Sequence, residues 1–138
     1  MIFAESTQQK VHILRLQPFE DLRQALKAFA SDKNLKAGFV VSGMGSLTVA
    51  SLRFASAKET TILNGPFEIV SLSGSLFCEG VHLHMSVSDG KGQVFGGHLM
   101  DGSLVRTTAE LILQSYPDVS MTRSLDQQTG FLELDFLR

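Results

Sequence analysis

The sequence predicts an α+β domain with a single, mostly antiparallel β-sheet of about seven strands, one main helix and few short helices. Three observations lead to this fold class. Short runs of apolar and β-branched residues recur between Gly, Asn and Asp turn signals. One stretch, at about residues 19–33, has the spacing of an amphipathic helix. The 138 residues are 43% hydrophobic and 19% charged, which suits one soluble core, so we expect residues 1–138 to form one domain with a loose segment at 1–8.

The first strand and the helix are predicted near the N-terminus. Residues 11–16 alternate between two partly apolar faces, which is typical of a strand, and we place His12 at the surface. Pro18 suits a first helical turn, so the helix is expected to begin at residue 19 and to end near Asn34. Its apolar face is formed by residues at helical spacing: Leu22, Ala25, Leu26 and Phe29.

The middle of the chain predicts several short strands. They are expected at 37–42, 47–55, 60–63 and 67–72. The Gly-Met-Gly-Ser segment at 43–46 predicts a tight turn or bulge, because a phosphate-binding loop would continue into a third glycine or a Lys-Ser/Thr pair and a helix. Asn64 and Gly65 indicate a turn, and Gly74 indicates a bulge.

The C-terminal part of the chain adds two strands. Residues 104–116 fit either a strand or a helix by periodicity, and their Val-Arg-Thr-Thr start favours a strand. Pro117 ends this element, and a loop follows. Residues 126–130 then predict a turn, with a final strand at 131–136.

Charge and cysteine usage limit the class of protein. The net charge is −2 and the isoelectric point is about 6.0, so composition gives no general attraction to nucleic acid or to an anionic membrane. The single cysteine, Cys78, cannot form an internal disulfide and lies in an apolar run, where we expect a buried, inert thiol. No apolar stretch approaches 18 residues, and we therefore expect a cytoplasmic protein without a membrane role.

Three of the four histidines lie in one predicted β-hairpin. Its strands are expected at 76–88 and 93–100, joined by the Asp-Gly-Lys-Gly turn signal between them. His82 and His84 are two residues apart, so on a strand both imidazoles point to the same face.

The position of His98 depends on the length of the hairpin loop. A loop of residues 89–91 places His98 opposite His82, whereas a loop of residues 90–92, with its last glycine left-handed, places it opposite His84. A two-residue turn would send His98 to the other face. We favour an odd-numbered loop, which puts all three rings on one face.

Three imidazoles on one face predict a metal site formed by His82, His84 and His98. Opposed Cβ atoms on neighbouring strands lie about 5 Å apart, which suits convergence on one ion. Three neutral nitrogens with an open fourth position suit zinc best, and nickel, copper or ferrous iron are chemically acceptable. The competing interpretations are a metal-free cluster of hydrogen-bonded histidines and a site in which Cys78 adds a fourth ligand.

With these residues laid out, the chain resembles the plants-and-prokaryotes-conserved domain family, the PPC domain. The matching segments are FVVSGMGS at 39–46, GPFEIVSLSG at 65–74, HLH at 82–84, GGHL at 96–99, Arg123 and GFLEL at 130–134. Together they extend over about residues 8–137, and their order and spacing carry the resemblance.

The resemblance, which is to stand-alone bacterial members of the family, implies an antiparallel sheet with few helices that assembles as a homotrimer. It also implies that His82, His84 and His98 form a metal-binding unit. In plants the domain is fused to AT-hook motifs, which gives the family its association with DNA and transcription regulators. This sequence departs from the plant pattern, because it contains no Arg-Gly-Arg-Pro core and has Pro66 where plant members carry arginine.

Two functions follow as hypotheses. The first is a homotrimeric, metal-binding protein without enzymatic activity, which contacts DNA or a transcription regulator. The alternative is a metal-dependent enzyme of the hydrolase type, with Glu68, Glu79 or Asp101 as general base. A cupin barrel fits less well, since Ser88 stands where cupins have a glutamate. Trimerisation would also cover the apolar sheet surface that one helix leaves exposed.

Overall fold

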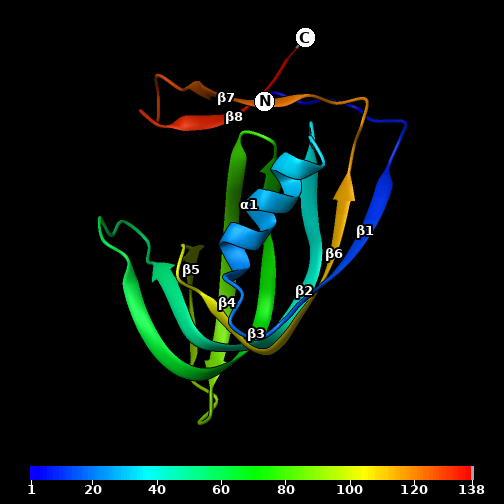
Figure 1. The fold of residues 1–138 in the computed structure, drawn as a ribbon. Coiled ribbons are helices and arrows are strands. Elements are labelled where there is room, and N and C mark those ends of the chain that lie inside the picture. Colours follow the sequence, from blue (N-terminus) through cyan, green and yellow to red (C-terminus); the bar gives the residue numbers. More distant parts are fainter. Residues whose placement is uncertain (138) are drawn as a thin grey trace.

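The structure, a computed structural model, describes residues 1–137 and is built mainly from antiparallel strands (Figure 1). Its elements are β1 (Lys10–Leu16), α1 (Leu22–Asp32), β2 (Gly38–Arg53), β3 (Thr61–Phe77), β4 (Gly80–Asp89), β5 (Val94–Leu99), β6 (Leu104–Ser115), β7 (Met121–Leu125) and β8 (Leu132–Phe136). Six strands form one sheet in the order β1-β6-β2-β3-β4-β5, and β7 pairs with β8. The predicted α+β class is confirmed. Within residues 1–137, no helix is long and apolar enough to span a membrane.

The sheet curls on itself because β2 is long and bends. Residues 38–49 pair with β6 and residues 39–52 pair with β3, whereas the C-terminal end of β2 also pairs with β5, where Leu52 lies opposite Leu99 and Arg53 opposite His98. Register shifts along β2 mark bulges, which increase local bending and twist. The Gly-rich segment at 43–46 lies within β2, so the predicted bulge is confirmed and no phosphate loop forms.

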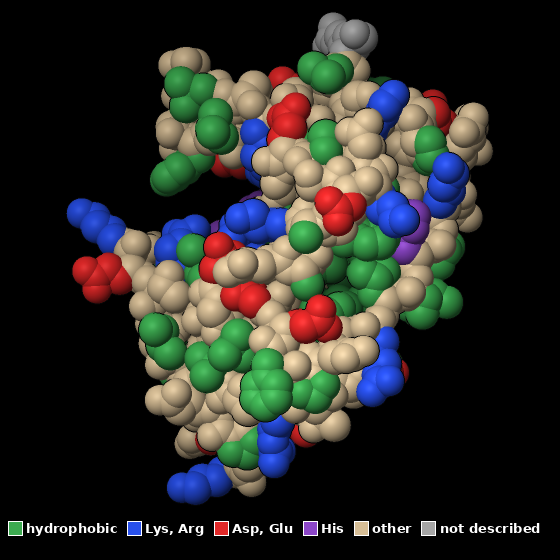
Figure 2. All heavy atoms as spheres, viewed as in Figure 1, with side chains coloured by type: hydrophobic (Ala, Val, Ile, Leu, Met, Phe, Trp, Pro, Cys, Tyr) green, Lys and Arg blue, Asp and Glu red, His purple; other side chains and the backbone are tan. Residues whose placement is uncertain are grey.

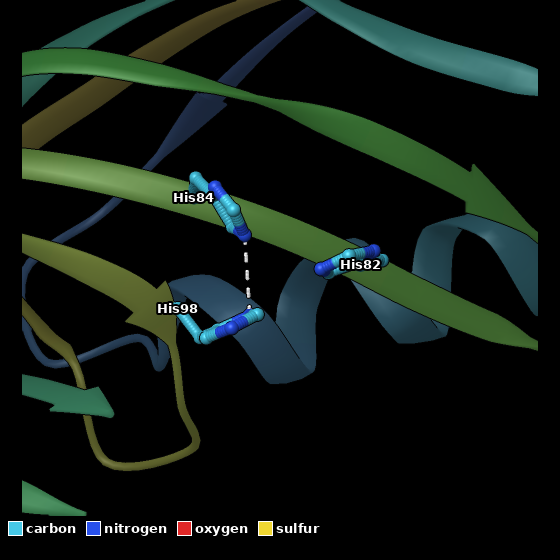
Figure 3. A group of neighbouring side chains, drawn as sticks. All are labelled: His82, His84 and His98. Carbon is cyan, nitrogen blue, oxygen red and sulfur yellow. Dashed lines mark hydrogen bonds between the residues drawn. The ribbon is translucent and has the colours of Figure 1, made fainter. Parts of the chain in front are cut away.

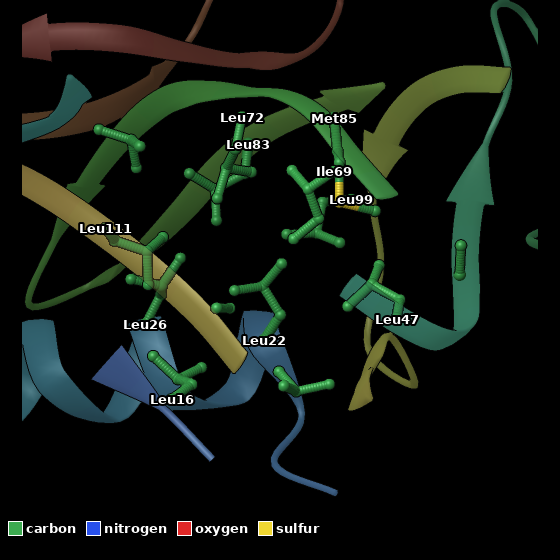
Figure 4. Packing of buried hydrophobic residues seen from close by; sticks show 14 of the residues in the cluster. Leu16, Leu22, Leu26, Leu47, Ile69, Leu72, Leu83, Met85, Leu99 and Leu111 are labelled. Carbon is green, nitrogen blue, oxygen red and sulfur yellow. The ribbon is translucent and has the colours of Figure 1, made fainter. Parts of the chain in front are cut away.

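Helix α1 lies on the concave side of the curved sheet, which we call the inner face. Leu22 and Leu26 are fully buried there, and they belong to the same cluster as Leu83, Met85 and Leu111 of the sheet (Figure 4). Removal of this apolar surface from water is the main source of stability for the fold. The opposite, convex side of the sheet is called the outer face below.

The helix begins later than predicted. Asp21 is its N-cap and accepts hydrogen bonds from the backbone N–H groups of Arg23, at 3.0 Å, and Gln24, at 3.1 Å. Phe19 has φ 73°, which is incompatible with a helical turn, so the segment after Pro18 is a turn and the helix starts at Leu22. The helix predicted at 19–33 is therefore confirmed, but its predicted first residue is wrong.

Four other predictions from the sequence are wrong in detail. Asn64 and Gly65 lie inside the continuous strand β3, which bends at a register shift instead of turning. The expected strand at 76–88 is divided by the turn between β3 and β4, and Cys78 lies at this turn, exposed instead of buried. His12 is half-buried, because its Nε2 lies 2.9 Å from Ser115 Oγ and its ring meets Phe29 edge-on.

Gly74 is needed where β3 meets the strand that carries the histidines. Its φ is 137°, and a Cβ there would collide with the carbonyl oxygen of His82 and lie 2.8 Å from Leu83 Cα. We expect Gly74→Ala to lower the free energy of unfolding by about 3 kcal/mol, because strain and a backbone collision add. Urea unfolding followed by far-ultraviolet circular dichroism, at one fixed protein concentration, measures this loss.

Gly80→Ala is the matched control for that substitution. Gly80 has φ 156°, but no heavy atom lies within 4 Å of the point that a Cβ would occupy there. It should therefore lose only about 1 kcal/mol from backbone strain. Equal losses in the two variants would show that β3 and β4 do not approach each other as closely as described.

Candidate metal centre

The turn between β4 and β5 fixes which residues face each other. Gly92 is left-handed, with φ 80°, and the Asp89 N–H donates to the carbonyl oxygen of Gln93 at 2.9 Å. The Asp89 carboxylate accepts from the N–H groups of Lys91, at 2.8 Å, and Gln93, at 2.9 Å. The loop is therefore residues 90–92, one of the two predicted odd-numbered loops. His84 lies opposite His98 as a result.

The three histidines converge on the outer face of the sheet (Figure 3). His84 Nε2 lies 3.2 Å from His98 Nδ1, and one nitrogen from each of the three rings lies within 4.8 Å of the others. The ring of His82 stacks on that of His98, with centroids 5.2 Å apart. Leu83, between His82 and His84 in the sequence, points inward and is 1% exposed. The alternation of side chains along β4 therefore places core residues on one face and the histidines on the other.

This arrangement fits a tetrahedral metal ion. Two nitrogens bound to one zinc ion at its usual bond length are about 3.3 Å apart. The separation of 3.2 Å between His84 Nε2 and His98 Nδ1 matches that value. His82 would need only a small side-chain movement to complete a set of three ligands. Cys78 does not belong to the cluster.

The surroundings keep two of the rings in the form that binds metal. Partial burial lowers the pKa of His82 below its ordinary value, and the positive charge of Arg123 lowers it further. Partial burial also lowers the pKa of His98, followed by the charge of Arg53. A lowered pKa keeps an imidazole neutral near pH 7, and the neutral ring is the metal ligand.

Arg123 reaches the cluster because the β7–β8 pair packs on the outer face. Phe77, at the end of β3, and Met121 are buried together in a second apolar cluster that attaches this pair to the sheet. The Arg123 side chain lies over the Phe77 ring, 6.0 Å from its centroid, and donates to Ser75 Oγ at 3.2 Å. This contact was not expected from the sequence, because a loop and not β7 was predicted after Pro117.

Arg53 reaches the cluster through the pairing of β2 with β5. It is the last residue of β2 and lies directly opposite His98, so the Cβ atoms of the two residues are about 5 Å apart on the same face of the sheet. No local sequence signal could have revealed this neighbour, because the two residues are far apart in the chain and their strands are not consecutive.

The carboxylates considered as general bases are not at the histidines. Glu68 is exposed on β3 and Glu79 is exposed at the β3–β4 turn, and neither lines the two clefts that the histidines line. Asp101 instead pairs with Arg23 at 2.5 Å. The acidic residue that does line both clefts is Glu133 of β8, whose charge acts on His82.

Comparison with known proteins places these features in a family. Residues 3–117 match the family model of the Plants and Prokaryotes Conserved (PCC) domain. The chain is 47% identical to the bifunctional protein GlmU of Synechococcus over 125 residues, which cover 91% of this chain and 20% of that protein. It is 27% identical to AT-hook motif nuclear-localized protein 21 of Arabidopsis thaliana, over 90% of this chain and 46% of that protein. The chain thus spans a fifth to a half of these relatives.

Solved structures share the fold over nearly the whole chain. A hypothetical protein from Salmonella enterica is 39% identical, with a TM-score of 0.94 over 97% of this chain and 96% of that chain. A metal-containing protein from Archaeoglobus fulgidus is 26% identical, with a TM-score of 0.81 over 100% of both chains.

The two arginines should act on different histidines. Removing a nearby positive charge favours the protonated ring, so Arg123→Gln should raise the pKa of His82 more than that of His98. Arg53→Gln should do the reverse. Titration of the metal-free protein, followed by NMR of the imidazole carbons, measures both. Equal pKa shifts of both histidines in both variants would contradict the placement of Arg123 beside His82 and of Arg53 beside His98.

Proposed function

This chain belongs to the Plants and Prokaryotes Conserved domain family, and we propose that it is a cytoplasmic, metal-binding homotrimer that associates with DNA or a transcription regulator. The observation that carries the proposal is the convergence of three imidazole nitrogens within 4.8 Å on one face of the sheet. We take residues 1–138 as one domain of this family, and we assign it no enzymatic step.

We propose zinc as the metal and His82, His84 and His98 as its ligands. The donor set supports this choice, because three nitrogens and a free fourth position are typical of zinc sites open to a further ligand. The similarity to a metal-containing protein of Archaeoglobus fulgidus supports metal binding in general. When bound, the ion would supply positive charge and Lewis acidity at the outer face.

Self-association is supported by an exposed apolar stripe on the same outer face. It runs across three neighbouring strands, β1, β6 and β2, and contains Ile13 (83% exposed), Ile112 (41%), Val41 (57%) and Met44 (58%). Apolar surface of this kind on a soluble protein marks a site of association. A second and third copy of this chain are the occupants that we propose.

The proposed DNA association rests on the similarity to plant AT-hook proteins. Because the net charge of the chain is −2, we place the contact through a transcription regulator or a local cationic surface instead of general attraction to phosphates. A gel shift with AT-rich duplex at low salt, with and without such a regulator, would test this part of the proposal.

A metal-dependent hydrolase is the second candidate, and one observation favours it. Glu133 lines the clefts beside the histidines, where a carboxylate could take a proton from water. The candidates predicted from the sequence, Glu68, Glu79 and Asp101, do not occupy that place.

His84→Ala should abolish tight metal binding, since it removes one of the three proposed ligands and leaves only two imidazoles. Zinc-loaded, dialysed protein should contain one ion per chain, and the variant should contain nearly none by elemental analysis. His12→Ala is the control, because His12 lies outside the cluster. Full zinc retention by folded His84→Ala protein would overturn the metal site.

Light scattering of the purified protein should give a mass three times the 15.1 kDa of one chain. Ile112→Lys should lower that mass, because it places a charge in the centre of the apolar stripe. Leu125→Lys is the matched control, since Leu125 is 59% exposed on β7, outside the stripe. A monomer at micromolar concentration of the unchanged protein contradicts the proposed trimer.

A further inference from the structure

A cleft of about 610 Å³ lies between the histidine cluster and the β7–β8 pair. Its walls come from the ends of β2, β4 and β5 on one side and from β7 and β8 on the other. Figure 2 shows a notch below the β7–β8 pair, with Lys and Arg side chains gathered in it. The volume falls within the range of about 300–1,000 Å³ that small-molecule sites occupy.

Two arginines in this cleft have unused hydrogen-bond donors. Within residues 1–137, neither Arg53 nor Arg123 has a carboxylate within 4.0 Å. Their side chains donate to neutral oxygens, Arg53 to the Ala57 carbonyl at 3.4 Å and Arg123 to Ser75 Oγ at 3.2 Å. A guanidinium group has five N–H donors in a planar fork, so most of the donors on each remain available.

The charge in the cleft is unbalanced. Arg23 also lines it but is neutralised by Asp101 at 2.5 Å. Glu133 is the acidic lining residue, and it can offset only one of the two remaining arginines. A divalent ion held by the histidines would add two further positive charges. Such an excess of positive charge in a partly enclosed site attracts an anion.

The walls of the cleft are partly apolar. Leu132 and Phe131 of the β7–β8 pair are 62% and 71% exposed, and they line the cleft together with Val81. These side chains could cover a short carbon skeleton, while the arginines bind its charged end. The combination of apolar walls with a few convergent polar groups is typical of small-ligand sites.

We propose that this cleft binds a small organic oxyanion, a carboxylate or a phosphate monoester, through Arg53 and Arg123 beside the three histidines. The inference rests on the proposed function, because it places the anion next to a metal held by His82, His84 and His98. It adds the chemical class of ligand that the metal site would accept.

Titration of the cobalt-loaded full chain tests the proposal. Malonate and methyl phosphate serve as probes, malonamide serves as the neutral control, and binding is followed by the visible spectrum of cobalt and by calorimetry. At least one of the two anions should bind and change the spectrum, whereas malonamide should not. Arg53→Gln and Arg123→Gln should each retain cobalt and weaken anion binding by about tenfold.

Arg106→Gln is the matched control, because Arg106 is exposed on β6 and does not line the cleft. It should bind the anions like the unchanged protein. Arg123→Lys, which keeps the charge but loses the planar fork, should bind anions between the unchanged protein and Arg123→Gln.

The outcomes separate this inference from the proposed function. If cobalt does not bind, both are overturned. If cobalt binds but neither anion changes its spectrum, or if malonamide binds equally, only this inference is overturned. Equal weakening by Arg106→Gln also overturns it, since the attraction would then be non-specific. Binding of one probe alone supports the inference and identifies the anion class.

Discussion

The register of the β4–β5 hairpin is the constraint on which the rest of the site depends. Gly92 accepts the left-handed conformation that closes a three-residue loop, and the Asp89 carboxylate holds that loop through two backbone N–H groups. A slip of one residue would turn His98 inward and carry Leu99, which is 2% exposed, out to solvent. Burial of the core therefore also fixes the position of the third histidine.

The same register positions the cationic side chains. Because β5 pairs with β4 on one edge and with the end of β2 on the other, His98 lies between His84 and Arg53. The β7–β8 pair then adds Arg123 from the opposite wall, attached through the packing of Phe77 with Met121. Two distant parts of the chain thus supply positive charge to one cluster, and this charge contributes to the lowered pKa values of His82 and His98.

What could be predicted from the sequence was local. The spacing of His82 and His84, the turn chemistry before Gly92 and the helical spacing around Leu26 each involve contacts within a few residues, and the structure agrees with all three. The missed features were long-range. Pairing of β2 with β5 and the packing of β7 on the outer face leave no periodic signal, so Arg53 and Glu133 could not be placed. Cys78 was wrongly predicted to be buried, because it follows an apolar run and the turn between β3 and β4 has no clear signal in the sequence.

The alternation along β4 lets one strand supply side chains to the hydrophobic core on one face and to the histidine cluster on the other. Leu83 and Met85 are 1% and 2% exposed on the inner face, whereas His82 and His84 point outward and are exposed. The imidazoles on the outer face do not add unpaired polar groups to the core, since their side chains lie on the opposite side of the sheet. Arg123 and Glu133, whose charges act on His82, come from a separate element, the β7–β8 pair. The proposed binding of a metal and an anion at the outer face could therefore be altered through β7 and β8 while the packing of α1 against the inner face stays the same.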